Sequence, residues 1–200
     1  MKILVEFLTS FVFIGRYFFL LIFYPHATMR KISREKDINQ IFIIFLLVFF
    51  YLKFAYFLKD QPYPATFLFL IFLLTFWSTI FFFYFLSKLF NRKINLSSFI
   101  FTFSYAFLPT LFWYVVNSFL FILLPPPRTP SVLGISFSIL YLGFSLSLIW
   151  WKIILVYLAI RFSSGFSFWR IIYLIILYLI VFYPYFYLIS YFGIFYLPLI

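Results

Sequence analysis

Few residues in this chain could carry acid–base or nucleophilic chemistry. Such catalysis needs a titratable side chain within hydrogen-bond reach of the reacting atom. The chain has no cysteine, which excludes thiol catalysis, cysteine-ligated zinc, iron–sulfur clusters and disulfides within it. The remaining candidate acids and bases are Glu6, His26, Glu35, Asp37 and Asp60.

These candidates are not grouped along the chain. Glu35 and Asp37 lie in a basic stretch and are interpreted as solvated charges, while Asp60 lies in a turn. His26 follows a proline and has no partner motif. No two carboxylates fall on one face of an apolar segment, which disfavours metal-assisted hydrolysis and carboxylate-pair chemistry. We therefore expect no catalytic residue, no metal site, no cofactor and no enzymatic activity.

The composition is that of a membrane protein. Hydrophobic residues make up 67% of the 200 residues and charged residues 10%, against roughly 45–50% and about 25% in ordinary soluble domains. Too few polar side chains remain to coat a soluble fold. The net charge of +11 would raise the question of nucleic acid in a soluble protein. Here it is better explained by basic membrane loops, and we expect no nucleic-acid partner.

Five apolar runs are long enough to cross a bilayer, whose core of about 30 Å needs roughly 20 residues of helix. They lie at 41–58, 67–86, 99–124, 132–160 and from 171 onward. Turns or loops separate them at 59–64, 88–98, 125–130 and 161–165. The sequence therefore predicts an all-α membrane protein, a bundle of five transmembrane helices.

The apolar segment at 3–24 has two interpretations. Its polar residues fall near one helical face, which favours a helix lying in the membrane interface; they are Glu6, Thr9, Ser10, Arg16 and Tyr17. A sixth span is the alternative. We divide the chain into this N-terminal interfacial or membrane helix (1–24) and a five-span membrane domain (25–200).

The basic residues predict the orientation. In one frame the loops on one side hold nine lysines and arginines and the other loops hold two, Lys59 and Arg128. Because basic loops stay in the cytoplasm, we expect the richer side to be cytoplasmic and the C-terminus to lie outside. The nine are Arg30, Lys31, Arg34, Lys36, Lys88, Arg92, Lys93, Arg161 and Arg170.

Polar residues before the apolar runs predict helix N-caps. Asp37 followed by Gln40 has the form of a capping box. Asn95, Ser97 or Ser98 can cap the 99–124 segment, and Ser167 the last one.

Two lysines, Lys53 and Lys152, fall at membrane depth, where a cation is a functional hypothesis. A lysine can also snorkel its ammonium to the headgroups, and we favour such anchoring for both. Lys152 lies deeper and is the better candidate for holding an anionic lipid headgroup. Arg30 and Lys31 would suit anionic headgroups as well, although setting the topology explains them equally.

The 99–124 segment carries a polar stripe. Thr102, Tyr105 and Pro109 share a face, and Trp113 and Asn117 continue it with a drift. Pro109 has no N–H for the Tyr105 carbonyl and should bend the helix. We favour a bundle-facing stripe of hydrogen bonds between helices. The alternative is a seam that a lipid headgroup or a partner helix enters.

Small residues mark two faces of the 132–160 segment. Gly134, Ser138 and Ser145 lie along one face, and Gly143 with Ser147 along another. Small residues four apart let helix backbones approach closely. They predict packing within the bundle or with a partner, without distinguishing the two.

The arrangement resembles the Yip-domain (Ypt-interacting protein) family of membrane proteins. The resemblance rests on the basic segment 24–32, on the phenylalanine, tyrosine and proline pattern at 98–109, and on the end of the fourth span at 148–161. It covers roughly 24–190. Five spans with the N-terminus inside and the C-terminus outside also match this family.

The chain departs from the family at 91–93, where Asn-Arg-Lys replaces the frequent paired glycines. It also lacks the long hydrophilic N-terminal region of eukaryotic members. These differences disfavour a Rab-type trafficking role and favour a prokaryotic plasma-membrane member.

The resemblance implies a non-enzymatic protein that organises membranes. We expect an accessory or assembly subunit that packs against other membrane proteins, a transporter or a second copy of itself. The alternative is a lipid-handling protein, scramblase-like or lipid-binding, that uses Lys152, the 105–117 stripe and the basic loop.

Overall fold

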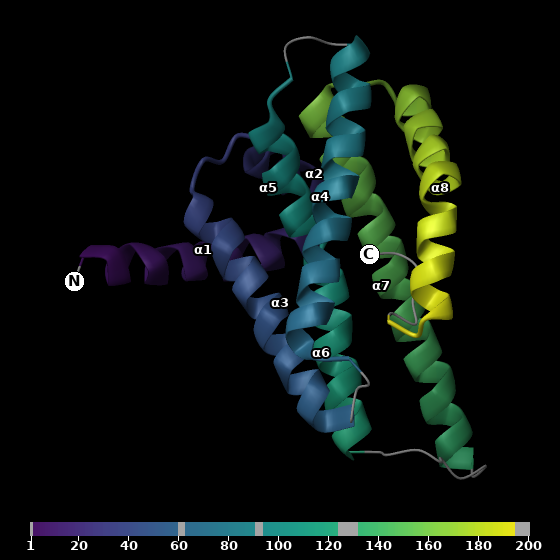
Figure 1. The fold of residues 1–200 in the computed structure, drawn as a ribbon. Helices are drawn as coiled ribbons and strands as arrows, with labels where there is room; N and C mark the ends of the chain where they lie inside the picture. The colour runs from purple at the N-terminus through teal and green to yellow at the C-terminus, as the bar shows by residue number, and fades with distance from the viewer. Residues whose placement is uncertain (1, 60–62, 91–93, 124–131, 195–200) are drawn as a thin grey trace.

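In a computed structural model, the part of the chain that is described folds entirely into helices joined by short turns (Figure 1). The described residues are 2–59, 63–90, 94–123 and 132–194. The helices are α1 (Lys2–Phe23), α2 (Pro25–Ile32), α3 (Ile38–Lys59), α4 (Ala65–Phe90), α5 (Leu96–Ala106), α6 (Leu108–Leu123), α7 (Val132–Ser164) and α8 (Phe168–Tyr191).

The expected all-α membrane bundle is confirmed. Six helical segments of the described chain are long and apolar enough to cross a membrane, counting α5 and α6 together as one and α1 as another. In Figure 1, α3, α4, α5 with α6, α7 and α8 run alternately up and down, as five consecutive crossings would. The loop predicted at 125–130 and the residues at 60–62 and 91–93 lie outside the described residues.

Helix α1 lies differently from the other long helices. It runs across the direction of α3, α4 and α7 rather than along it (Figure 1), and it packs against α2 and α3. By length and composition alone, its segment Val5–Phe23 could cross a membrane. The crosswise placement favours the interfacial interpretation of this helix.

The middle of the bundle is the crossing made by α5 and α6. In its most apolar window 67% of residues are buried, against 11% for α7 and for α8. Aromatic rings fill the contacts around it. Phe103 stacks on Phe83 of α4 with centroids 5.5 Å apart, and Phe107 lies 4.9 Å from Phe72. The high phenylalanine content therefore supplies the core as well as the lipid-facing surface.

The bend predicted at Pro109 is present and divides this crossing into two helices. The Phe107 N–H still donates to the Phe103 carbonyl (3.1 Å). The N–H groups of Thr110 and Leu111 then turn to the Phe107 carbonyl (3.0 and 3.2 Å). Pro109 has no N–H to donate, so the i−4 ladder stops and restarts here.

The basic stretch after α1, expected to be a loop, is partly helical. Pro25 stands in the first turn of α2, where its fixed φ suits a helix and its missing N–H costs nothing. Thr28, Met29 and Ile32 are buried on one face, while Arg30 and Lys31 are exposed. The two cations among its eight residues obscured this short amphipathic pattern in the sequence.

The predicted caps had mixed outcomes. Asp37 precedes α3 and accepts the Asn39 N–H on Oδ1 (3.2 Å), as an N-cap does. Asn95 and Ser167 occupy the N-cap positions of α5 and α8, but neither side chain makes a capping hydrogen bond. The predicted turn at 161–165 begins later than expected, at Gly165, whose φ of +71° suits glycine.

Candidate functional site

Polar side chains from α1, α3, α5 and the α2–α3 connection meet in one cluster, which we call the junction network. Two of its six members, Glu35 and Asp37, are half-buried carboxylates, and the other four are buried. The full set is Ser10, Tyr17, Glu35, Asp37, Gln40 and Tyr105.

Hydrogen bonds run through the junction network from α1 to α5. The Ser10 hydroxyl donates to Asp37 Oδ2 (2.6 Å), and Gln40 Nε2 donates to the same oxygen (3.2 Å). The Tyr105 hydroxyl donates to Gln40 Oε1 (2.6 Å). Gln40 thus links the carboxylate of Asp37 to the buried tyrosine.

A second branch of the network carries the other carboxylate. The Tyr17 hydroxyl donates to Glu35 Oε2 (3.1 Å), and its ring meets the Tyr105 ring edge to face at 5.6 Å. Lys31 places its Nζ 5.6 Å from the centroid of the Tyr17 ring, a cation–π distance. Two helices and a turn therefore converge on Tyr17.

The interpretation of Glu35 and Asp37 as solvated charges was wrong. Both are half-buried and accept hydrogen bonds from α1. The reason lies in tertiary structure, because α1 folds back against the start of α3 and brings Ser10 and Tyr17 to carboxylates 27 and 18 residues away. Hydrogen bonds to an ionised acceptor are stronger than those between neutral groups.

Three residues of the predicted stripe on 99–124 hold this crossing against α7. Thr102 bonds Ser163 (2.9 Å), and Trp113 Nε1 donates to the Ser145 hydroxyl (3.1 Å). Asn117 Oδ1 accepts from the hydroxyl of Tyr141 (3.1 Å). The favoured interpretation as hydrogen bonds between helices describes these three contacts.

The other two stripe residues have different roles. Tyr105 faces α3 through Gln40 rather than α7, and Pro109 forms the helix break. The sequence predicted all five on one drifting face of a bent helix. The helix instead divides at Phe107, between Tyr105 in α5 and Pro109 in α6.

Lys152 is buried within the bundle, with 9% of its surface exposed. It lies seven residues after Ser145 and eleven before Ser163, which places all three on one face of α7. Those serines bond residues on either side of the α5–α6 break. The register therefore brings Lys152 to the level of that break.

Lys53 differs from Lys152, although anchoring was the favoured interpretation of both lysines. It is exposed on α3, with its Nζ 5.9 Å from the Phe49 ring centroid. An exposed ammonium over a ring of its own helix fits snorkelling.

Basic residues gather at the end of the bundle where α4 and α7 finish and α8 begins (Figure 1). Lys88 Nζ donates to the Tyr84 hydroxyl (3.1 Å), and Arg161 Nη1 donates to the Tyr157 hydroxyl (3.2 Å). Each cation thus uses a tyrosine one turn earlier in its own helix. The start of α3, and with it α2, lies toward the same end.

Hydroxyl pairs between α4 and α8 were missed by the sequence analysis. Thr79 bonds Tyr178 (2.8 Å), and Thr75 bonds Tyr185 (2.5 Å). Both threonine hydroxyls also donate to the carbonyl one turn back, at 2.8 Å. Their spacing of four residues, opposite tyrosines seven apart, was the available signal.

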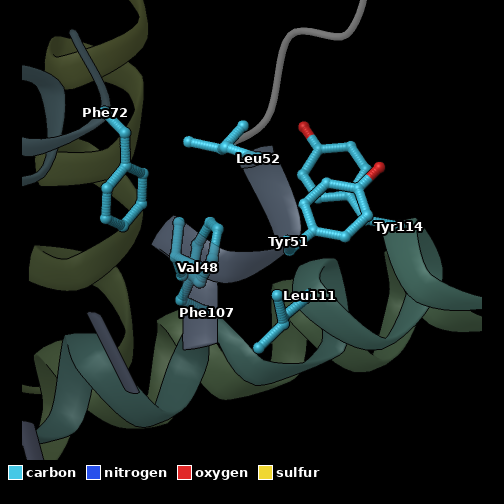
Figure 2. A pocket seen from close by; sticks show the side chains of 7 residues that line it. All are labelled: Val48, Tyr51, Leu52, Phe72, Phe107, Leu111 and Tyr114. Atoms are coloured by element: carbon cyan, nitrogen blue, oxygen red, sulfur yellow. The ribbon is translucent and has the colours of Figure 1, made fainter. Parts of the chain in front are cut away.

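A small apolar cavity lies between α3, α4 and the α5–α6 crossing (Figure 2). The rings of Tyr51 and Tyr114 stack at its edge, 5.2 Å apart and nearly parallel. Its volume of about 20 Å³ holds about one water and no lipid chain. The lining residues are Val48, Tyr51, Leu52, Phe72, Phe107, Leu111 and Tyr114.

Within the described residues, no three histidine, aspartate or glutamate side chains stand together as metal ligands would. The fold and its polar contacts define the protein as an all-α, multi-pass membrane protein. No family model, no curated protein and no solved structure matches this chain.

Proposed function

We propose that this protein is a non-enzymatic accessory or assembly subunit of the Yip-domain type. It acts within the membrane by packing against partner membrane proteins or against a second copy of itself. The observation that carries this proposal is an unoccupied face of α7 made of small residues, centred on Gly143 and Ser147.

This face of α7 is open in the single chain. Gly143 and Ser147 are both exposed, and a Cβ built on Gly143 would meet no atom within 4 Å. The Ser147 hydroxyl donates to the Gly143 carbonyl (2.9 Å), so it needs no further partner. The face therefore combines a smooth backbone surface with satisfied polar groups.

The opposite side of α7 is already used by the bundle. Ser145 and Ser163 bond α6 and α5 there. A second helix could approach the Gly143 side closely, because small residues leave the backbone accessible. Lipid chains can cover large apolar side chains as well as small ones. A face of small residues is an advantage only to another helix, whose backbone can then approach closely, so such a face favours a protein partner.

Two further features support the proposed membership in the Yip-domain family. The five crossings alternate in direction, as the resemblance implies. The tyrosine and proline of the family pattern, Tyr105 and Pro109, stand at a buried contact and at the break of the central crossing. On this proposal the membrane is a prokaryotic plasma membrane with the basic loops in the cytoplasm.

Cysteine crosslinking tests the proposed contact directly, because the chain has no cysteine of its own. We expect Gly143→Cys and Ser147→Cys to crosslink in native membranes to a defined protein, either a second copy or a partner. Gly143→Leu should abolish recovery of that protein in mild detergent. It should leave the fold intact, because the site is open and leucine favours helix more than glycine does.

Ile180→Cys provides the matched control, since Ile180 is an exposed residue on the lipid-facing side of α8. It should give no defined crosslink. Equal crosslinking from all three positions, or a monodisperse chain without partner in which Gly143→Leu changes nothing, would contradict the proposal.

Lipid handling is the second candidate, and the burial of Lys152 at the level of the helix break favours it. A buried ammonium beside an interrupted helix could attract a headgroup into the bundle. Reconstituted liposomes should then show lipid flipping that Lys152→Met removes and Lys53→Met leaves unchanged. Equal flipping rates in protein-free and protein-containing liposomes would exclude this candidate.

A further inference from the structure

The segment from Arg30 to Asp37 separates its charges by sign. Its two acidic side chains, Glu35 and Asp37, turn toward α1 and accept the hydroxyls of Tyr17 and Ser10. Its basic side chains are all exposed, although Lys31 also extends over the Tyr17 ring of α1; they are Arg30, Lys31, Arg34 and Lys36. From the sequence, Glu35 and Asp37 were interpreted as solvated charges within the basic stretch.

The fold of α2 fixes this separation. Thr28, Met29 and Ile32 pack into the bundle, which leaves the other side of α2 to the cations. The Ser33 N–H donates to the Met29 carbonyl, and the Arg34 N–H to the Lys31 carbonyl. The helical turn therefore continues past Ile32, and Arg30 and Arg34 lie on the same side, one turn apart.

The surroundings of this surface are apolar. Helix α1, which packs against α2, exposes large apolar side chains such as Val12, Phe19 and Phe23. Such a helix needs acyl chains to cover it. With α1 lying in the membrane interface, these apolar side chains would contact acyl chains, and the cations of α2 would stand near the phosphate groups.

We propose that Arg30, Lys31, Arg34 and Lys36 form a binding surface for the headgroups of anionic phospholipids. We call it the α2 basic face. Four cations without their neighbouring carboxylates attract anionic headgroups, and the apolar residues of α1 contact the acyl chains of the same lipid. A soluble phosphate would use only the first of these two contacts. The proposal does not rest on the α7 contact described above.

Native mass spectrometry of the detergent-solubilised chain can measure this binding. The probes are dioleoyl-phosphatidylglycerol, the matching phosphatidylcholine and inorganic phosphate. We expect phosphatidylglycerol to bind at least about tenfold more tightly than phosphatidylcholine, and inorganic phosphate not to compete. Each juxtamembrane cation contributes roughly a fivefold factor in affinity, so Arg30→Gln/Arg34→Gln should weaken phosphatidylglycerol binding by more than about tenfold.

Lys88→Gln/Arg161→Gln is the matched control, because it removes the same charge from the same end of the bundle. These two cations already bond tyrosines of their own helices, and we expect a loss of less than about threefold. Thermal unfolding of both double variants verifies that the chain is folded. Equal losses in the two variants, equal binding of both lipids, or full competition by inorganic phosphate would each overturn the proposal.

Discussion

The hydroxyl of Tyr105 and the amide oxygen of Gln40 form a bond that water cannot easily replace. The two side chains are 0% and 2% exposed, and the bond is 2.6 Å long. Breaking a buried hydrogen bond leaves its acceptor without a partner, which costs about 1–3 kcal/mol. The unfolding free energy of the bundle should therefore depend on the hydroxyl group of Tyr105.

Tyr105→Phe tests that dependence. We expect the variant to lose about 1–2 kcal/mol of unfolding free energy, measured by reversible denaturation in mixed detergent micelles. Tyr173→Phe removes the same atom from an exposed position on α8 and should change stability by less than about 0.5 kcal/mol. Equal effects in the two variants would mean that the bond to Gln40 contributes nothing.

The role of an individual residue was predicted well where it depends on neighbours along the chain. It was predicted poorly where it depends on residues of another helix. Pro109 breaks the helix because of its own ring, so the sequence suffices. The distant partners of Glu35 and Asp37, Tyr17 and Ser10, come from α1, and nothing within the basic stretch indicates them. Tyr105 was placed on a stripe of interhelical hydrogen bonds, but its partner Gln40 was assigned only to a cap.

At the scale of elements, Asp37 both begins α3 and fastens α1. Its Oδ1 accepts the Asn39 N–H, and its Oδ2 accepts Ser10 and Gln40. The Asp37 carboxylate thus caps the N-terminus of α3, which contributes about 0.5–2 kcal/mol to stability. It also joins α3 to α1. We expect α1 to depend on it more than the rest of the bundle does.

Asp37→Ala should therefore loosen α1 selectively. In hydrogen exchange on the reconstituted protein, peptides covering 5–20 should lose protection, while those of α5 and α7 should keep it, since different helices make those contacts. Glu6→Ala, which removes an exposed charge from α1 itself, should leave the pattern unchanged. Uniform loss of protection across all helices would contradict a local fastening role.

Element boundaries show what periodicity can and cannot give. Both ends of α3 and the start of α8 were predicted to within three residues, because long apolar runs must be helical to satisfy their backbone in lipid. Helix α2 was missed, since eight residues with two cations give a weak apolar pattern. Its first-turn proline was the signal that could have revealed it.

At the scale of the whole molecule, apolar length predicted the five long helical segments that run alternately up and down (Figure 1), because a bilayer demands about 20 residues from each helix. The same criterion could not place α1, which satisfies it and yet lies across the bundle. Its contacts with α2 and α3, its bonds to Glu35 and Asp37, and the bond from Trp151 Nε1 to the Leu21 carbonyl (3.3 Å) together fix its direction. The side of the membrane on which each end of α1 lies is the measurable consequence of this direction.

Single cysteines at Glu6, Pro64, Asn95 and Ser167, all exposed positions, can be labelled from either side of sealed vesicles. The alternating helices place Asn95 and Ser167 at one end of the bundle and Pro64 at the other. The excess of basic residues predicts that Asn95 and Ser167 face the cytoplasm. Glu6 should label with Asn95, because a helix lying in the interface keeps its N-terminus on the side of α2. Labelling of Glu6 together with Pro64 would instead make α1 a sixth crossing, and labelling of Pro64 with Ser167 from one side would contradict the bundle itself.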